Sequence, residues 1–179
     1  DAMVCGPPDD PSTQIGALIS LEHLEKVESY IELGLEEGGT ILTGGTREMT
    51  GQVTEADDGA FLRPTIIDGL DHTSRTSTEE IFGPVVTVHR FDSDEQALEM
   101  ANSTEYGLAG SIWSTNIDRA HALAQQIETG IIWVNTWLHR DLRTPFGGVK
   151  NSGVGREGGN WSLGFFSEPL NVCIKHSQE

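Results

Sequence analysis

Two carboxylates and an aromatic side chain stand together in the segment 79–84, which reads Glu-Glu-Ile-Phe-Gly-Pro. A carboxylate at this place could accept hydrogen bonds from both hydroxyls of a ribose, and Phe82 could pack against a flat ring. The segment comes directly before a run of β-branched residues that begins at Val85. The pattern therefore predicts either a nucleotide contact or a capped turn that carries a core phenylalanine.

Two arginines follow the apolar stretch from Ile131 to Val134. Arg140 and Arg143 are three residues apart in the run 135–143. Guanidinium groups bind carboxylates through two parallel hydrogen bonds, so this pair predicts an anionic substrate in a chain that is otherwise acidic. A local pairing of Arg140 with Asp141, or a contact between subunits, explains the arginines equally well.

The segment 153–158, Gly-Val-Gly-Arg-Glu-Gly, matches the dinucleotide-binding pattern G-x-G-x-x-G. That fingerprint requires a strand directly before it and a helix that opens from it, whereas a polar, glycine-rich run precedes it here. We therefore do not assign a phosphate site to this segment. Its glycine content instead predicts a loop that allows a close approach of the backbone.

The elements that position these residues alternate between strands and helices. Apolar residues at helical spacing predict a helix that begins after Ser20 and ends at Gly38. Further helices are predicted after Ser93 and over 117–127, and extended segments over 40–43, 61–67, 85–91, 109–114 and 131–134. This order indicates parallel pairing, so we expect an α/β fold with an open, mostly parallel sheet flanked by helices.

Composition and charge limit the class of protein. The 179 residues fit one domain, and 28 acidic against 11 basic residues give a net charge of -17, which disfavours nucleic acid and anionic membranes as partners. Cys5 and Cys173 have neither metal spacing nor a disulfide framework, and no apolar run reaches the length of a membrane span. We expect a cytoplasmic protein without a metal site and, because the chain opens without an initiator Met, a part of a longer protein.

Five ordered blocks resemble the aldehyde dehydrogenase superfamily and span nearly the whole chain. They are EEIFGPV (79–85), YGLA (106–109), GIIWVN (130–135), PFGGVK (145–150) and SGVGRE (152–157). The run 135–146 more narrowly resembles the branch that acts on 2-hydroxymuconic and 2-aminomuconic semialdehydes. The resemblance implies an NAD-dependent oxidation, or one with NADP, in which a cysteine thiolate attacks the aldehyde, hydride passes to the nicotinamide and water hydrolyses the thioester.

The resemblance also implies roles for individual residues. Glu80 would hold the nicotinamide ribose, and Phe82 would pack near the nicotinamide. Phe146 would line the substrate tunnel and Glu157 would act as a second carboxylate in the proton path. Either Arg140 or Arg143 would bind the carboxylate of the substrate, a small aldehyde.

Two family segments are missing from this sequence. The nucleophile lies in an N-Q-G-Q-x-C type segment and the general base in an E-L-G-G segment, and neither is present. The surroundings of Cys5 do not match the nucleophile. We therefore expect residues 1–168 to be the partial catalytic domain of an aldehyde dehydrogenase, inactive alone.

The last segment is expected to serve in assembly. Residues 171–176 alternate as an edge strand does, so we expect 169–179 to be an oligomerisation strand and tail of a homodimer or homotetramer. Two alternatives are a non-catalytic binding or assembly module and, with less in its favour, an acyl-phosphate-forming reductase on the same scaffold.

Overall fold

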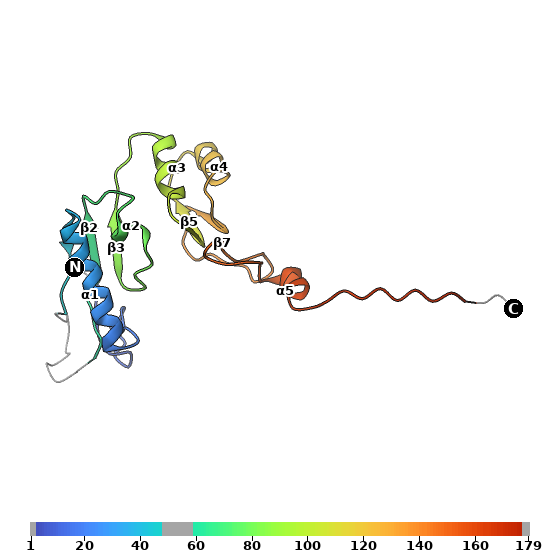
Figure 1. Ribbon diagram of the computed structural model, residues 1–179, viewed down its shortest axis with the longest axis horizontal. Helices are drawn as coiled ribbons and strands as arrows, with labels where there is room; N and C mark the ends of the chain where they lie inside the picture. The colour runs from blue at the N-terminus through green and yellow to red at the C-terminus, as the bar shows by residue number, and fades with distance from the viewer. Residues whose placement is uncertain (1–2, 48–58, 177–179) are drawn as a thin grey trace. The chain divides into compact units, whose positions relative to one another are not determined.

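The chain divides into two compact units, residues 1–93 and 94–179 (Figure 1). The computed structural model describes residues 3–47 and 59–176. Helices and strands alternate in both units, which confirms the predicted α/β class. No helix in the described ranges is long and apolar enough to cross a membrane.

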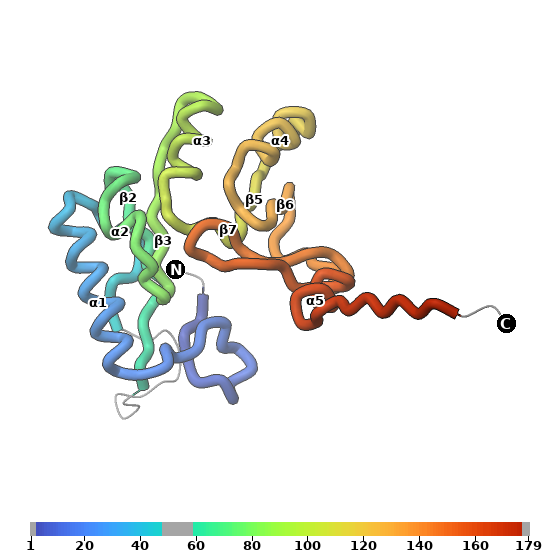
Figure 2. Tube along the Cα trace, turned by 45° about the vertical axis from the view of Figure 1, so that its right-hand side comes forward, coloured from blue at the N-terminus to red at the C-terminus, as the bar shows by residue number. Residues whose placement is uncertain are grey.

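The first unit contains one sheet with the strand order β1-β2-β3. Strand β1 pairs antiparallel with β2, and β2 pairs parallel with β3. Figure 2 shows helix α1 running alongside this sheet. The elements are α1 (Leu21–Glu36), β1 (Thr40–Thr43), β2 (Thr65–Asp68), α2 (Arg75–Thr78) and β3 (Val85–Val88).

Helix α1 forms where the sequence predicts it, because its start and its apolar face are both encoded locally. The Ser20 hydroxyl accepts a hydrogen bond from the His23 amide and so caps the first turn. Leu24, Val27 and Ile31 recur at helical spacing and are buried. They form the core of this unit together with Ala60, Leu62 and Ile81.

The second unit contains two short two-stranded sheets. Strand β5 pairs parallel with β6, as the strand–helix–strand order predicts, and β4 pairs antiparallel with β7. Asp94 on α3 and Arg119 on α4 form an ion pair that joins the two helices. The elements are α3 (Asp94–Asn102), β4 (Tyr106–Gly107), β5 (Ala109–Ile112), α4 (Ile117–Ala124), β6 (Ile131–Val134), β7 (Val149–Lys150) and α5 (Gly159–Phe165).

The sheets and the tail differ from the expectation. The described strands form three small sheets instead of one open sheet, and two of the four strand pairings are antiparallel. Residues 171–176 are exposed and form no strand, and 177–179 of the expected tail lie outside the described residues. A strand requires a hydrogen-bonded neighbour, so alternating residues alone do not make one in a single chain.

Candidate functional site

The segment 79–84 forms a turn between α2 and β3 in the first unit. Ile81 is its buried member, whereas Phe82 is 74% exposed. Phe82 has φ 60°, in the left-handed region that non-glycine residues rarely adopt. The alternative of a core phenylalanine is therefore wrong: the turn places Ile81 in the core and presents the ring of Phe82 at the surface.

The two carboxylates of this turn have different surroundings. Glu79 accepts hydrogen bonds from the Tyr30 hydroxyl and from Arg75 Nε, each at 2.7 Å. These contacts, above all the one from Arg75, lower the pKa of Glu79 from 4.5 to about 2. The neighbouring Glu80 is exposed, and among the described residues no hydrogen bond or ion pair involves its side chain. Glu79 therefore holds the turn, and Glu80 is the carboxylate that could accept ligand hydroxyls.

Three of the predicted site residues lie together in the second unit. Arg140 forms an ion pair with Glu157, with Nη2 and Oε1 2.5 Å apart. The guanidinium carbon of Arg140 also lies 3.9 Å from the centroid of the Phe146 ring, a cation–π contact. The backbones of Phe146 and Glu157 exchange two hydrogen bonds of 2.8 Å in an isolated antiparallel bridge. We refer to Arg140, Phe146 and Glu157 as the arginine cluster.

Arg143 does not belong to this cluster. Its side chain is 88% exposed and pairs with Asp141, two residues earlier, at 2.5 Å. The hydrogen bonds from Arg143 lower the pKa of Asp141. The structure therefore pairs Asp141 with Arg143, and the expected local pairing of Arg140 with Asp141 is wrong for the described residues.

Two members of the arginine cluster line a pocket of about 360 Å³. Phe146 and Glu157 contribute to its wall, together with Leu108, Ser152, Val154, Arg156, Phe165, Phe166 and the glycines at 147, 148, 153 and 155. The wall is mostly aromatic, aliphatic and glycine, with few polar groups, as is usual in sites for small organic ligands.

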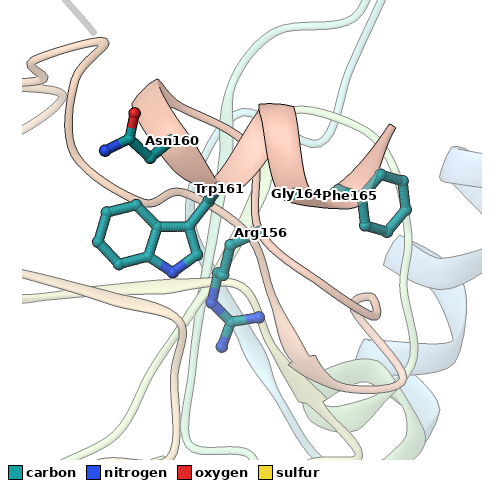
Figure 3. Close-up of a pocket in the computed structure, with 5 residues that line it drawn as sticks. All are labelled: Arg156, Asn160, Trp161, Gly164 and Phe165. Atoms are coloured by element: carbon teal, nitrogen blue, oxygen red, sulfur yellow. The ribbon is translucent and has the colours of Figure 1, made fainter. Parts of the chain in front are cut away.

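A second hollow, of about 450 Å³, lies beside α5 and shares Arg156 and Phe165 with the first. Figure 3 shows the side chains of Trp161 and Arg156 next to each other below the helix. Arg156 donates to the carbonyls of Gly148 at 2.8 Å and Gly155 at 2.7 Å, so it holds the glycine-rich loop together. This role of Arg156 was not predicted from the sequence, although the residue lies in the block 152–157.

The segment 153–158 lies between a strand and a helix that are both short. The two-residue strand β7 ends at Lys150, and α5, which follows, is only seven residues long. Gly153, Gly155 and Gly158 all have positive φ, as expected for a loop built on close backbone contacts.

The described residues contain two free cysteines, the buried Cys5 and the exposed Cys173, and no candidate metal site. Cys5 is buried, burial raises the pKa of its thiol, and its Sγ donates to the Leu62 carbonyl at 3.6 Å. A buried thiol with a raised pKa is a poor nucleophile. Within 3–47 and 59–176 there is no group of three or more His, Cys, Asp or Glu that could hold a metal ion.

His23, which was not predicted from the sequence, contacts the 79–84 turn. Its Nε2 lies 2.8 Å from the carbonyl oxygen of Phe82, and the two rings meet edge to face with centroids 6.3 Å apart. A lone histidine on an amphipathic helix gives no signal of its own. Only the packing of the 79–84 turn on α1 shows the contact.

The chain is similar to semialdehyde dehydrogenases over nearly its whole length. A 2-hydroxymuconic semialdehyde dehydrogenase from Pseudomonas sp. (strain CF600) is 51% identical over 176 residues, which cover 98% of this chain and 36% of that protein. A 2-aminomuconic 6-semialdehyde dehydrogenase from Pseudomonas sp. is 51% identical over 172 residues, covering 96% of this chain and 35% of that protein. The chain thus spans about a third of the length of these relatives.

The chain is also similar to solved structures of aldehyde dehydrogenases. A point mutant of betaine aldehyde dehydrogenase from Staphylococcus aureus, in complex with NAD+, is similar with a TM-score of 0.86 and 38% identity. The similarity covers 92% of this chain and 33% of that one. The sequence profile described as the aldehyde dehydrogenase family matches residues 1–172, and the chain therefore belongs to the aldehyde dehydrogenase family.

Proposed function

We propose that this chain is the carboxyl-terminal part of an NAD(P)-dependent aldehyde dehydrogenase that oxidises a carboxylated semialdehyde to the acid. The observation that carries the proposal is the arginine cluster, in which a guanidinium is fixed against the face of Phe146, a residue of the pocket wall. Such a cation suits the carboxylate end of an aldehyde. The names of the two Pseudomonas relatives support 2-hydroxymuconic or 2-aminomuconic semialdehyde as the substrate.

The residues of the 79–84 turn fit one part of the cofactor. The Glu80 carboxylate is exposed and offers acceptor oxygens for the two hydroxyls of a ribose, and Phe82 offers an exposed aromatic face. When bound, NAD supplies the acceptor for the hydride that leaves the substrate. Glu80 would bind its ribose and Phe82 would pack near its nicotinamide; the NAD+ complex of the staphylococcal relative supports this choice of cofactor.

We assign the substrate carboxylate to Arg140 and not to Arg143. The side chain of Arg140 is 33% exposed and is held by an ion pair and an aromatic face, so little side-chain freedom remains to be lost on binding. The side chain of Arg143 is 88% exposed, and its ion pair joins it only to Asp141, two residues earlier, instead of to a residue of the pocket wall. Phe146 would contact the carbon chain of the substrate, and Glu157, in the same wall, would accept a proton as the second carboxylate.

The remaining chemistry would come from outside these residues. The nucleophilic cysteine and the general-base glutamate would lie in the part of the protein that this chain does not contain. Cys5 does not suit the role of nucleophile, because it is buried and its thiol donates a hydrogen bond to a backbone carbonyl. The proposal assigns residues 1–168 to the catalytic domain and 169–179 to a segment that pairs subunits of a homodimer or homotetramer. The exposed apolar side chains of Val172 and Ile174 are the support for this second assignment.

The test compares two proteins. One is the chain alone; the other, the joined protein, is the chain extended at its amino terminus by the residues that the upstream coding sequence encodes. The proposal predicts NADH formation, followed by absorbance, only for the joined protein, with a muconic semialdehyde preferred over uncharged aldehydes. A joined protein that reduces neither NAD nor NADP with any aldehyde would contradict it. If that inactive protein still assembled through residues 169–179, the alternative of a non-catalytic assembly module would replace it.

A further inference from the structure

One face of helix α1 is in contact with the 79–84 turn along three residues. His23, Val27 and Tyr30 are four and three positions apart, a spacing that places their side chains on the same side of a helix. All three contact the turn, through Phe82, Gly83 and Glu79 respectively. The helix therefore serves as a platform for the turn, in addition to contributing to the core.

The contact of His23 falls on the strained residue of the turn. Phe82 has φ 60°, a conformation that side chains with a Cβ adopt only at a cost in conformational energy. The carbonyl of Phe82 accepts the hydrogen bond of 2.8 Å from His23, in which Nε2 must be the donor because a carbonyl cannot donate. This hydrogen bond fixes the peptide plane that follows Phe82 and thus favours the conformation in which its ring faces outward.

The neighbouring contacts leave the turn little freedom to move along the helix. A Cβ atom at position 83 would lie 2.7 Å from both methyl groups of Val27, so the backbone of Gly83 approaches the helix more closely than other residues could. At the other end, Tyr30 donates to Glu79 at 2.7 Å. Glu80, between these anchors, has an exposed side chain.

We infer that His23 is a positioning residue for the nicotinamide nucleotide, because its hydrogen bond to the Phe82 carbonyl holds the turn that presents Phe82 and Glu80. The inference rests on the proposed function, which supplies the nucleotide as the ligand. His23 need not touch the nucleotide; it acts through the backbone of the turn. Its loss should weaken the binding of the cofactor and leave the substrate residues of the second unit unaffected.

The test measures NAD binding and the exchange of backbone amides in the joined protein. His23→Ala should weaken NAD binding about three- to tenfold by titration calorimetry, the change expected from the loss of one hydrogen bond. Hydrogen–deuterium exchange should become faster in the peptide that covers 79–84. In His23→Gln, whose amide can still donate a hydrogen bond, NAD affinity and amide exchange should return most of the way to the wild-type values. His121→Ala, the same change at an exposed helical position on α4, is the matched control and should change neither.

The outcomes separate the inference from the proposed function. Unchanged NAD affinity or unchanged exchange at 79–84 in His23→Ala would overturn the positioning role. Faster exchange throughout α1 with no recovery in His23→Gln would also overturn it, because it would indicate a general loss of structure. A wild-type protein that binds no nicotinamide nucleotide would refute the proposed function itself, and the inference with it.

Discussion

If the proposed function is correct, replacing Arg140 by alanine should lower the activity of the joined protein on carboxylated aldehydes much more than on uncharged ones. A hydrogen bond to a charged group contributes about 1.5–3 kcal/mol. Arg140 also neutralises Glu157, so its removal leaves an unpaired carboxylate on the pocket wall. At about 6 Å and water-like screening that charge would repel an anionic substrate by about 0.7 kcal/mol. The loss should therefore amount to roughly 2.2–3.7 kcal/mol, or about 40- to 500-fold in kcat/KM.

The assay compares kcat/KM for a muconic semialdehyde with kcat/KM for an uncharged aldehyde of similar length. Arg140→Ala should lower the value for the uncharged aldehyde by less than about threefold, because that substrate lacks the carboxylate. Arg143→Ala is the control: this arginine is exposed and paired with Asp141, and surface pairs contribute less than about 1 kcal/mol, so losses should stay below about fivefold. Equal losses for both aldehydes, or a larger loss in Arg143→Ala, would refute the assignment.

Two further predictions concern stability. In Gly130→Ala the new Cβ would lie 1.5 Å from the Gly147 carbonyl oxygen, so the backbone must shift. Thermal denaturation should show that the free energy of unfolding falls by about 3 kcal/mol or more. Gly164→Ala is the control: it has open space around it and should be neutral or stabilising by up to about 1 kcal/mol. The pKa of Glu79 is about 2 in the fold and 4.5 ordinarily, so its contribution to stability is present above about pH 4.5 and is lost as the pH falls toward 2. The melting-temperature difference between wild type and Glu79→Gln should therefore be clear at neutral pH and vanish near pH 2; a difference that persists in acid would contradict the role of Arg75 as its partner.

Elements encoded by local signals were predictable from the sequence. Helix α1 has its cap at Ser20 and an apolar stripe, and strand β6 is a continuous apolar run, so neither depends on distant residues. The parallel pairing of β5 with β6 followed from the helix between them. The division into small mixed sheets did not follow, because the antiparallel pairs β1–β2 and β4–β7 depend on long-range register and on loops without a periodic signal.

In the candidate site, too, contacts between residues far apart in the chain could not be predicted from the sequence. The residue types singled out the 79–84 turn and the arginine pair as candidates, but the sequence could not tell Glu79 from Glu80 by their surroundings. Those depend on Tyr30, 49 residues earlier in the chain. Likewise the pairing of Arg140 with Glu157 spans 17 residues, and only the fold shows it.

The most direct test of the central proposal is the identity and amount of product. The joined protein should convert 2-hydroxymuconic semialdehyde to the corresponding dicarboxylic acid, identified by mass spectrometry, with NADH formed in equal amount to the acid. Formation of an alcohol or an acyl phosphate, or of acid without an equal amount of NADH or NADPH, would contradict the account.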